Sequence, residues 1–178
     1  MLVPLPTRSA TDTEGEVARV LTKLDAAGAQ MKLLRLLANS EAGFRPFVLL
    51  TSGLLSSRHL PRRIQEIVIL HLAARQGTRY EWEEHVPMAA AHGVEPQLVA
   101  SIEANGAAAG DAFTAEELLA VAFADDVLGG ASLAGERWDA AARAWGEAGA
   151  LDLLMTVAIW GALVPTVITG LGLERATS

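Results

Sequence analysis

Residues 60–94 read LPRRIQEIVILHLAARQGTRYEWEEHVPMAAAHGV. Pro61 stands where a helix can begin, and residues 63–74 are nearly all good helix formers around the unbroken apolar run 67–70. Gly77 is a natural stop, and Gly93 suits the end of a second helix over 79–92. The stretch therefore predicts two helices, joined by a short turn, that pack antiparallel.

The rest of the chain also has apolar residues at helical spacing, and no segment alternates as a strand would. Thr114 and Glu117 match a capping box, and residues 146–149 read as a turn. Residues 1–13 read as an extended arm. We expect one all-α domain over residues 1–178, with about eight or nine helices. The expected further helices lie near 17–24, 31–37, 41–55, 96–106, 115–128, 134–146 and 149–171.

Composition excludes several classes of function. Of the 178 residues 51% are hydrophobic but only 5% aromatic, which favours close helix packing over a β-sandwich. A net charge of −7, with the basic residues scattered, argues against nucleic acid as a partner. The chain has no cysteine, so disulfides, thiolate metal sites and thiol catalysis are excluded. A cytoplasmic location fits this composition.

The membrane alternative rests on residues 151–173, an apolar stretch that is long enough to cross a bilayer. Asp152 is the one charged residue within it. Pro165, several glycines and threonines, and the lack of basic anchors on one side favour a helix buried in a core or a subunit interface. The N-terminus has no apolar core long enough for a signal peptide. We therefore expect no membrane association.

One group of side chains could carry chemistry. Glu81 and His85 are four residues apart on the predicted second helix, and His92 lies seven beyond His85, with Met88 between them. Glu66 on the first helix precedes four apolar residues and is expected to face partly inward. Such a group permits proton transfer, because imidazole titrates near neutral pH and burial can raise the pKa of a carboxyl group.

Each of these residues also has an ordinary interpretation. Glu81 and His85 could be a surface pair, and His92 could be a cation at a helix C-terminus. His71 could be a core or interface histidine with its hydrogen bonds satisfied. Arg63 could form a structural ion pair with Glu66, or it could meet an anionic substrate. A metal held by carboxylates and His85 is a further alternative, although the chain has no His-Glu-x-x-His motif.

The residues in this region resemble the carboxymuconolactone decarboxylase-like superfamily, which includes the alkylhydroperoxidase-D-like proteins. The resemblance also covers residues 31–55 and the apolar helix at 155–170. It implies an orthogonal helical bundle and a homo-oligomer: a dimer, trimer or hexamer. The motifs are Leu60-x-x-Arg63-x-x-Glu66-x-x-Ile69-Leu70, Tyr80-Glu81-Trp82-x-x-His85 and Ala91-His92-Gly93-Val94.

The resemblance separates two kinds of activity. The peroxidase branch uses Cys-x-x-Cys-x-x-x-His, whose cysteine positions fall here on Thr78 and Glu81, so thiol peroxidase activity is excluded. The decarboxylase branch resembles Glu-x-x-x-His, which Glu81 and His85 satisfy. It implies a cofactor-free loss of CO2 with His85 as the acid or base, Glu81 orienting it or acting as a second base, and Glu66 tuning it.

The resulting prediction is a cofactor-independent lyase for a small enolisable acid or lactone, without a metal. The alternatives are an isomerase or dehydratase on the same fold, a non-catalytic ligand-binding or scaffold protein, and a metal-dependent oxygenase or hydrolase. The predicted catalytic residues are His85, Glu81 and Glu66. The predicted substrate-binding residues are Arg63, His71, Tyr80, Trp82, Met88, His92 and Trp160.

Overall fold

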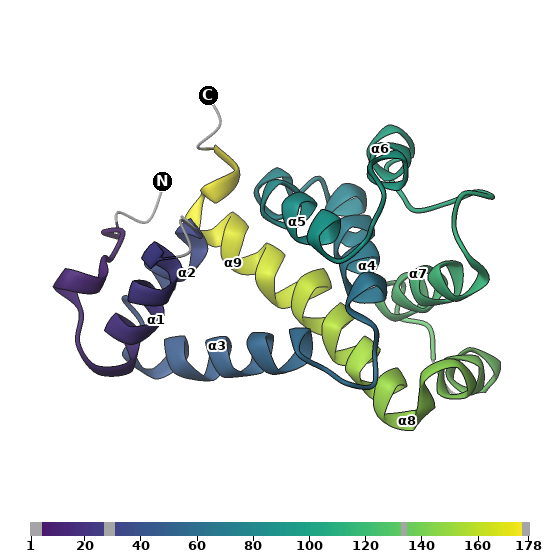
Figure 1. Ribbon diagram of the computed structural model, residues 1–178, viewed down its shortest axis with the longest axis horizontal. Coiled ribbons are helices and arrows are strands. Elements are labelled where there is room, and N and C mark those ends of the chain that lie inside the picture. Colours follow the sequence, from purple (N-terminus) through teal and green to yellow (C-terminus); the bar gives the residue numbers. More distant parts are fainter. Residues whose placement is uncertain (1–4, 27–30, 133–134, 176–178) are drawn as a thin grey trace. The chain divides into compact units, whose positions relative to one another are not determined.

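The computed structural model describes residues 5–26, 31–132 and 135–175, and within these ranges all regular structure is helical (Figure 1). The all-α prediction is confirmed for this part of the chain. In order the elements are η1 (Ala10–Asp12), α1 (Gly15–Ala26), α2 (Lys32–Leu37), α3 (Glu41–Leu55), α4 (Arg62–Gln76), α5 (Arg79–Ala91), α6 (Pro96–Asn105), α7 (Ala115–Leu128), α8 (Glu136–Ala158), the π-helical turn η2 (Ile159–Leu163), α9 (Val164–Leu171) and η3 (Leu173–Arg175).

The chain divides into two compact units, residues 54–167 and residues 1–53 with 168–178. The prediction of a single domain stays a prediction. In the second of these units, the described part of the predicted N-terminal arm lies against α2. The backbone N–H of Arg8 donates to the carbonyl of Arg35 at 3.0 Å, and its Nε donates to Asn39 Oδ1 at 2.8 Å. Residues 1–4 of the arm lie outside the described residues.

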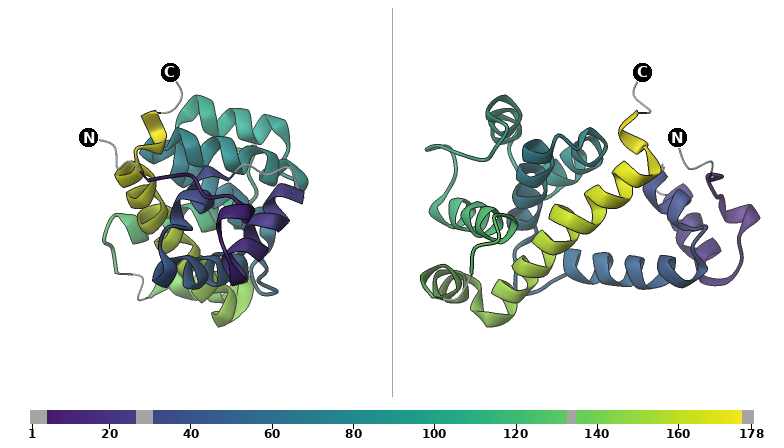
Figure 2. Two further views of the ribbon diagram at one scale, coloured as in Figure 1. Left: turned by 90° about the vertical axis from the view of Figure 1, so that its left-hand side faces the viewer. Right: turned by 180° about the vertical axis from the view of Figure 1, so that it is seen from behind.

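Helix α4 is the centre of the unit formed by residues 54–167. It packs against α5, α6, α7, α8 and η2 (Figures 1 and 2). Every residue from Ile64 to Ala73 is buried, which explains why this helix has no clear polar face. The polar members of that run, among them Glu66 and His71, therefore need partners inside the protein.

The two ends of α4 are set by residues that are already notable in the sequence. Pro61 occupies the position before the first turn of α4, and Gly77 ends that helix in the left-handed conformation, with φ of 66°. The backbone N–H of Thr78 returns to the carbonyl of Ala73 at 3.0 Å, which satisfies an end of the helix that would otherwise be unpaired. Gly77 and Thr78 thus form the short turn from α4 to α5 that the sequence predicts.

Two further local predictions are confirmed. Thr114 and Glu117 form the capping box of α7, with Glu117 N–H donating to Thr114 Oγ1 at 3.2 Å and Thr114 N–H donating to Glu117 Oε2 at 2.7 Å. The predicted turn at 146–149 is a kink inside α8, where Gly146 takes φ of 72° and ψ of 167°. Only glycine adopts that backbone conformation readily.

The helical run Glu136–Leu171 is the one described segment long enough and apolar enough to cross a membrane by length and composition. A core helix meets the same criterion, and 44% of the most apolar window of this run is buried.

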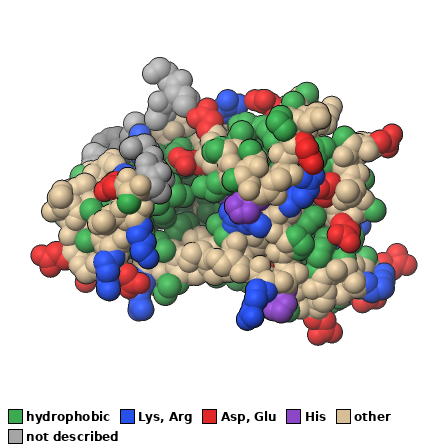
Figure 3. All heavy atoms as spheres, in the orientation of Figure 1, with side chains coloured by type: hydrophobic (Ala, Val, Ile, Leu, Met, Phe, Trp, Pro, Cys, Tyr) green, Lys and Arg blue, Asp and Glu red, His purple; other side chains and the backbone are tan. Residues whose placement is uncertain are grey.

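On the face drawn in Figure 3, acidic and basic side chains are interspersed, with no basic patch.

Candidate acid–base site

The predicted trio of Glu66, Glu81 and His85 comes together between α4 and α5. His85 Nδ1 lies 2.8 Å from Glu66 Oε2, and His85 Nε2 lies 3.1 Å from Glu81 Oε1. The exposed fractions of the three side chains are 0% for Glu66, 5% for Glu81 and 7% for His85. The pair of Glu81 and His85 is therefore not a surface pair.

The geometry determines the protonation of the imidazole ring. An ionised carboxylate only accepts hydrogen bonds, so each ring nitrogen that faces one must carry a proton. Burial by itself lowers the pKa of His85, but hydrogen bonds and charge attraction from Glu66 and Glu81 outweigh it and raise that pKa to about 9. His85 is therefore an imidazolium at neutral pH, with both N–H groups engaged.

Arg62 completes this cluster, although it is not among the residues predicted from the sequence. Its Nη2 lies 2.5 Å from Glu66 Oε1, and its Nη1 donates to the carbonyl of Leu55 at 3.2 Å. Arg62 is four residues before Glu66 on α4, a spacing that places both side chains on one face of a helix. This four-residue spacing in the sequence could therefore have indicated that Arg62 pairs with Glu66. We call Arg62, Glu66, His85 and Glu81 the buried cluster.

The charges of the buried cluster balance. Arg62 and protonated His85 carry two positive charges, and Glu66 and Glu81 carry two negative ones. An isolated charge in a protein interior costs several kcal/mol, whereas a hydrogen-bonded set with no net charge avoids most of that penalty. The alternation of signs along the chain of contacts also gives every charge an opposite neighbour.

Trp160 covers one side of His85. The two rings meet edge to face, with centroids 6.2 Å apart and planes at 85°, and Trp160 is buried.

Trp160 belongs to the π-helical turn η2, where the helix holds one extra residue. Pro165 has no N–H for the carbonyl four residues before it, Gly161, and that carbonyl accepts instead from Gln76 Nε2 at 2.9 Å.

The structure places Arg63 apart from the buried cluster. Its Nε lies 2.7 Å from Glu117 Oε1, and its Nη2 lies 2.7 Å from Glu95 Oε2. The alternative of a structural ion pair between Arg63 and Glu66 is not found, because Arg62 takes that position. The reason is tertiary, because α7 and the loop before α6 bring two carboxylates to Arg63. We call Arg63, Glu95 and Glu117 the outer cluster.

His71 has the satisfied environment of a core histidine. Its Nδ1 accepts from the backbone N–H of Ala108 at 3.1 Å, so Nε2 carries the proton and donates to Asp125 Oδ1 at 3.0 Å. Burial lowers the pKa of His71, and Asp125 opposes that shift. Both nitrogens of a neutral ring are used, which leaves neither for a substrate carboxylate.

The remaining predicted binding residues lie in different surroundings. Tyr80 is half-buried and hydrogen-bonds to Glu84, while burial raises the pKa of Glu84. Trp82 is buried in an apolar core cluster. His92 is exposed, and its Nδ1 lies 2.9 Å from the carbonyl of Met88, which is the geometry of a histidine at a helix C-terminus. His92 therefore does not join His85.

A metal site was one alternative for this group. Within the described ranges, no set of three or more His, Asp or Glu side chains is arranged to hold an ion. At His85, both nitrogens that could ligate a metal are directed at carboxylates. The arrangement instead offers a sheltered proton donor, His85, next to a carboxylate acceptor, Glu81.

No family model, curated protein or solved structure matches this chain. The resemblance to the carboxymuconolactone decarboxylase-like superfamily therefore stays a prediction, and the function has to be argued from the geometry of the site.

Proposed function

We propose that this chain is a carboxymuconolactone decarboxylase-like protein with an alkylhydroperoxidase-D-like fold. Its activity is that of a cofactor-independent lyase in the cytoplasm, and its substrate is a small enolisable acid or lactone. One observation supports this above the rest: His85 is held between two buried carboxylates that come from two adjacent helices. Acid–base catalysis needs a positioned, sheltered proton donor of this kind.

The protonation of His85 assigns the roles. The imidazolium is the proton donor, and Glu81, the partner on its own helix, is the residue placed to accept a proton. Glu66 holds the ring from its other nitrogen, and Arg62 holds Glu66. In the resting state His85 is thus the acid, and it acts as a base only after it has given its proton away.

For a decarboxylation, the bond between the carboxylate carbon and the adjacent carbon breaks, and CO2 leaves. The electron pair of that bond moves into the neighbouring carbonyl or lactone group as an enolate. His85 donates its proton to the enolate carbon, which completes the product, and the ring recovers a proton from solvent. The low local dielectric of the buried cluster strengthens the attraction between the imidazolium and the forming enolate.

The test is turnover of lactone acids and β-keto acids by the wild type and by His85→Gln. A general acid contributes about 100-fold to 10,000-fold, so His85→Gln should lower kcat by at least about 100-fold. His59→Gln is the matched control, because His59 is exposed in the loop before α4. Equal rates for His85→Gln and wild type, with both folded by circular dichroism, would overturn the proposal.

The product distinguishes a lyase from an isomerase on the same site. Release of CO2 identifies decarboxylation. Exchange of a substrate C–H for deuterium from D2O, without CO2, identifies proton transfer alone and would replace the lyase with an isomerase or dehydratase.

A second candidate is a non-catalytic scaffold or ligand-binding protein. It is favoured by the charge balance of the buried cluster, because four mutually paired charges can serve fold specificity alone. On this alternative, His85→Ala and Glu81→Ala lower the melting temperature while no candidate substrate is turned over by the wild type.

We also propose a homo-oligomer. Leu151 is 51% exposed and Leu163 41% exposed, and both lie on the apolar run of α8 and η2. A second copy is a natural cover for such side chains. Light scattering after size-exclusion chromatography should give the mass of a dimer, trimer or hexamer, and a monomer mass at micromolar concentration would contradict this.

A further inference from the structure

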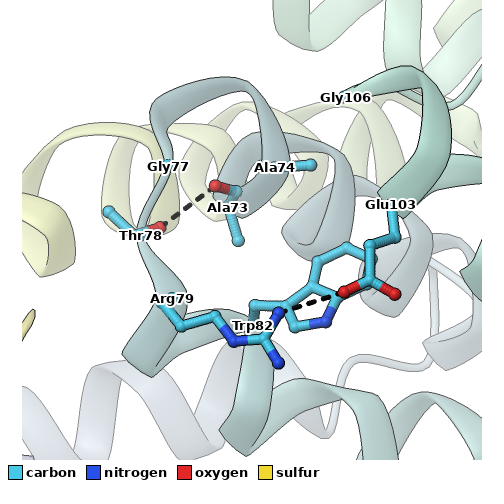
Figure 4. Close-up of a pocket in the computed structure, with 8 residues that line it drawn as sticks. All are labelled: Ala73, Ala74, Gly77, Thr78, Arg79, Trp82, Glu103 and Gly106. Atoms are coloured by element: carbon cyan, nitrogen blue, oxygen red, sulfur yellow. Dashed lines mark hydrogen bonds and ion pairs between the residues drawn. The ribbon is translucent and has the colours of Figure 1, made fainter. Parts of the chain in front are cut away.

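A cavity of about 190 Å³ lies where α4, α5 and α6 meet, and its lining includes neither His85 nor the two carboxylates beside it. Ala73 and Ala74 line it from the end of α4, and Trp82 lines it from α5 (Figure 4). Gly77 and Gly106 line it from the turns that end α4 and α6. The cavity exists because four of the residues around it have the smallest side chains.

The cavity is open to solvent, so its volume sets the size of the part of a ligand that it can hold. An apolar cavity of about 150 Å³ accommodates a benzene molecule, so this one accepts a single ring with a small substituent. The indole of Trp82 is the one aromatic ring in its lining, and with 6% of the residue exposed only a part of that ring faces the cavity. Aromatic rings pack on such a surface in offset or edge-to-face arrangements.

The charged groups at the cavity already have partners. Arg79 Nη1 lies 3.0 Å from Glu103 Oε1, and Arg79 Nε lies 2.8 Å from Glu83 Oε1. Figure 4 shows the pair of Arg79 and Glu103 running beside the Trp82 ring. The hydroxyl of Thr78 donates to the carbonyl of Ala73 at 3.4 Å, which leaves its lone pairs as acceptors.

The charges exclude ionic ligands. One arginine faces two glutamates here, so the rim carries a net negative charge and its guanidinium is neutralised. An anion would meet repulsion and would have to displace an existing ion pair. A cation would be attracted to that rim, but it would lose its hydration against the alanine surface, and Glu83 and Glu103 are already paired with Arg79.

We propose that this cavity binds a small, uncharged, ring-shaped apolar molecule that carries at most one hydroxyl or similar donor group. The ring lies against Trp82, and its donor group hydrogen-bonds to the Thr78 hydroxyl. The site is separate from the acid–base chemistry at His85, so this proposal does not depend on the proposed function.

Phenol is the probe, with benzoate and benzylamine as the same ring bearing a negative or a positive charge. Binding is followed on the full chain by ¹H–¹⁵N spectra of the four tryptophan indoles, where Trp82→Phe assigns the Trp82 signal. Phenol should shift the Trp82 signal along a saturating curve. Benzoate and benzylamine should bind at least about 10-fold more weakly, which corresponds to about 1.4 kcal/mol.

Ala74→Leu is the blocking variant, because its side chain adds volume to the cavity wall. It should weaken phenol binding at least about 10-fold. Ala100→Leu makes the same change on the exposed surface of α6 and should leave phenol binding unchanged. If Ala74→Leu does not fold, Thr78→Val serves instead, since it removes the acceptor at constant shape and should weaken phenol more than toluene.

Several outcomes would overturn the proposal. They are no saturation up to the solubility of phenol, shifts confined to other tryptophans, equal binding of benzoate, or equal binding by Ala74→Leu and wild type. His85→Gln should bind phenol as the wild type does, so a failure of the catalytic proposal leaves this result unaffected.

Discussion

Two consecutive arginines on α4 enter two different environments. Arg62 is 17% exposed and belongs to the buried cluster with Glu66, His85 and Glu81, whereas Arg63 is 29% exposed and belongs to the outer cluster with Glu95 and Glu117. All three residues of the outer cluster line a cavity of about 370 Å³. A step of one residue along a helix thus separates an interior charge network from one that is partly open to solvent, through Glu95.

The comparison shows that the environment of an ion pair matters more than its length. Both arginines have carboxylate partners between 2.5 and 2.7 Å away. Solvent screens the pair of Arg63 with Glu95, while Glu66 has no exposed surface at all. We therefore expect equal substitutions in the two clusters to have unequal effects.

The largest effect is expected for Arg62→Met against Arg63→Met. Arg62→Met leaves His85 as the one cation beside Glu66 and gives the buried cluster a net negative charge, which should lower the free energy of unfolding by about 3–5 kcal/mol. Arg63→Met should cost less than Arg62→Met, because its pair with Glu95 is exposed and Glu117, although buried, keeps the hydrogen bond from the N–H of Thr114. Urea denaturation of both variants measures the difference, and equal losses would show that the two clusters are equivalent.

The next effect is a dependence of stability on pH. The pKa of His85 is raised from 6.5 to about 9 in the folded protein, so its contribution is fully present below pH 6.5 and is lost as the pH rises through about 9. The size is roughly 3 kcal/mol. The urea midpoint should decrease more between pH 7 and pH 10 for the wild type than for His85→Gln. A parallel fall in the two proteins would contradict the raised pKa.

A third effect isolates Glu66. Glu66→Gln removes a negative charge from beside His85 Nδ1, so the pKa of His85 should fall by about 1–3 units. Long-range ¹H–¹⁵N spectra of the imidazole measure this directly. Glu95→Gln is the matched change in the outer cluster and should leave the His85 titration where it is in the wild type.

The smallest effect belongs to the outer cluster itself. The Arg63 guanidinium holds the pKa of the Glu95 carboxyl below its usual range, and both groups are open to solvent. The difference in urea midpoint between wild type and Glu95→Gln should therefore vanish when the salt concentration is raised to about 1 M, where the screening length is about 3 Å. A difference that persists would place this pair with the buried ones.

The same two arginines show how far the sequence predicts the site. The convergence of Glu66, Glu81 and His85 was predictable because helical spacing and one short turn place them together. Arg62 and Arg63 are four and three residues before Glu66, and local spacing allows either to pair with it. Glu95 and Glu117, which take Arg63, are distant in the sequence, so no local pattern decides between the two arginines.

Other differences have the same cause. The caps at Gly77 and Thr114 and the kink at Gly146 were predictable because each depends on neighbouring residues. The partners of His71, Asp125 and the N–H of Ala108, come from residues 54 and 37 positions away. The π-helical turn at Ile159–Leu163 was not predicted either, because Pro165 alone does not show that Gln76 would replace the missing donor.

That turn has a consequence for how the chain tolerates insertions and deletions. A π-helical turn holds one residue more than the α-helical turn it replaces, so it equals a single insertion absorbed without lengthening the helix. Deleting Ala162 would therefore restore the ordinary winding and leave the helical segments on either side of η2 in register with each other. Trp160, which lies inside the turn, would lose the wide winding that places its ring against the imidazole, although no contact residue had been substituted.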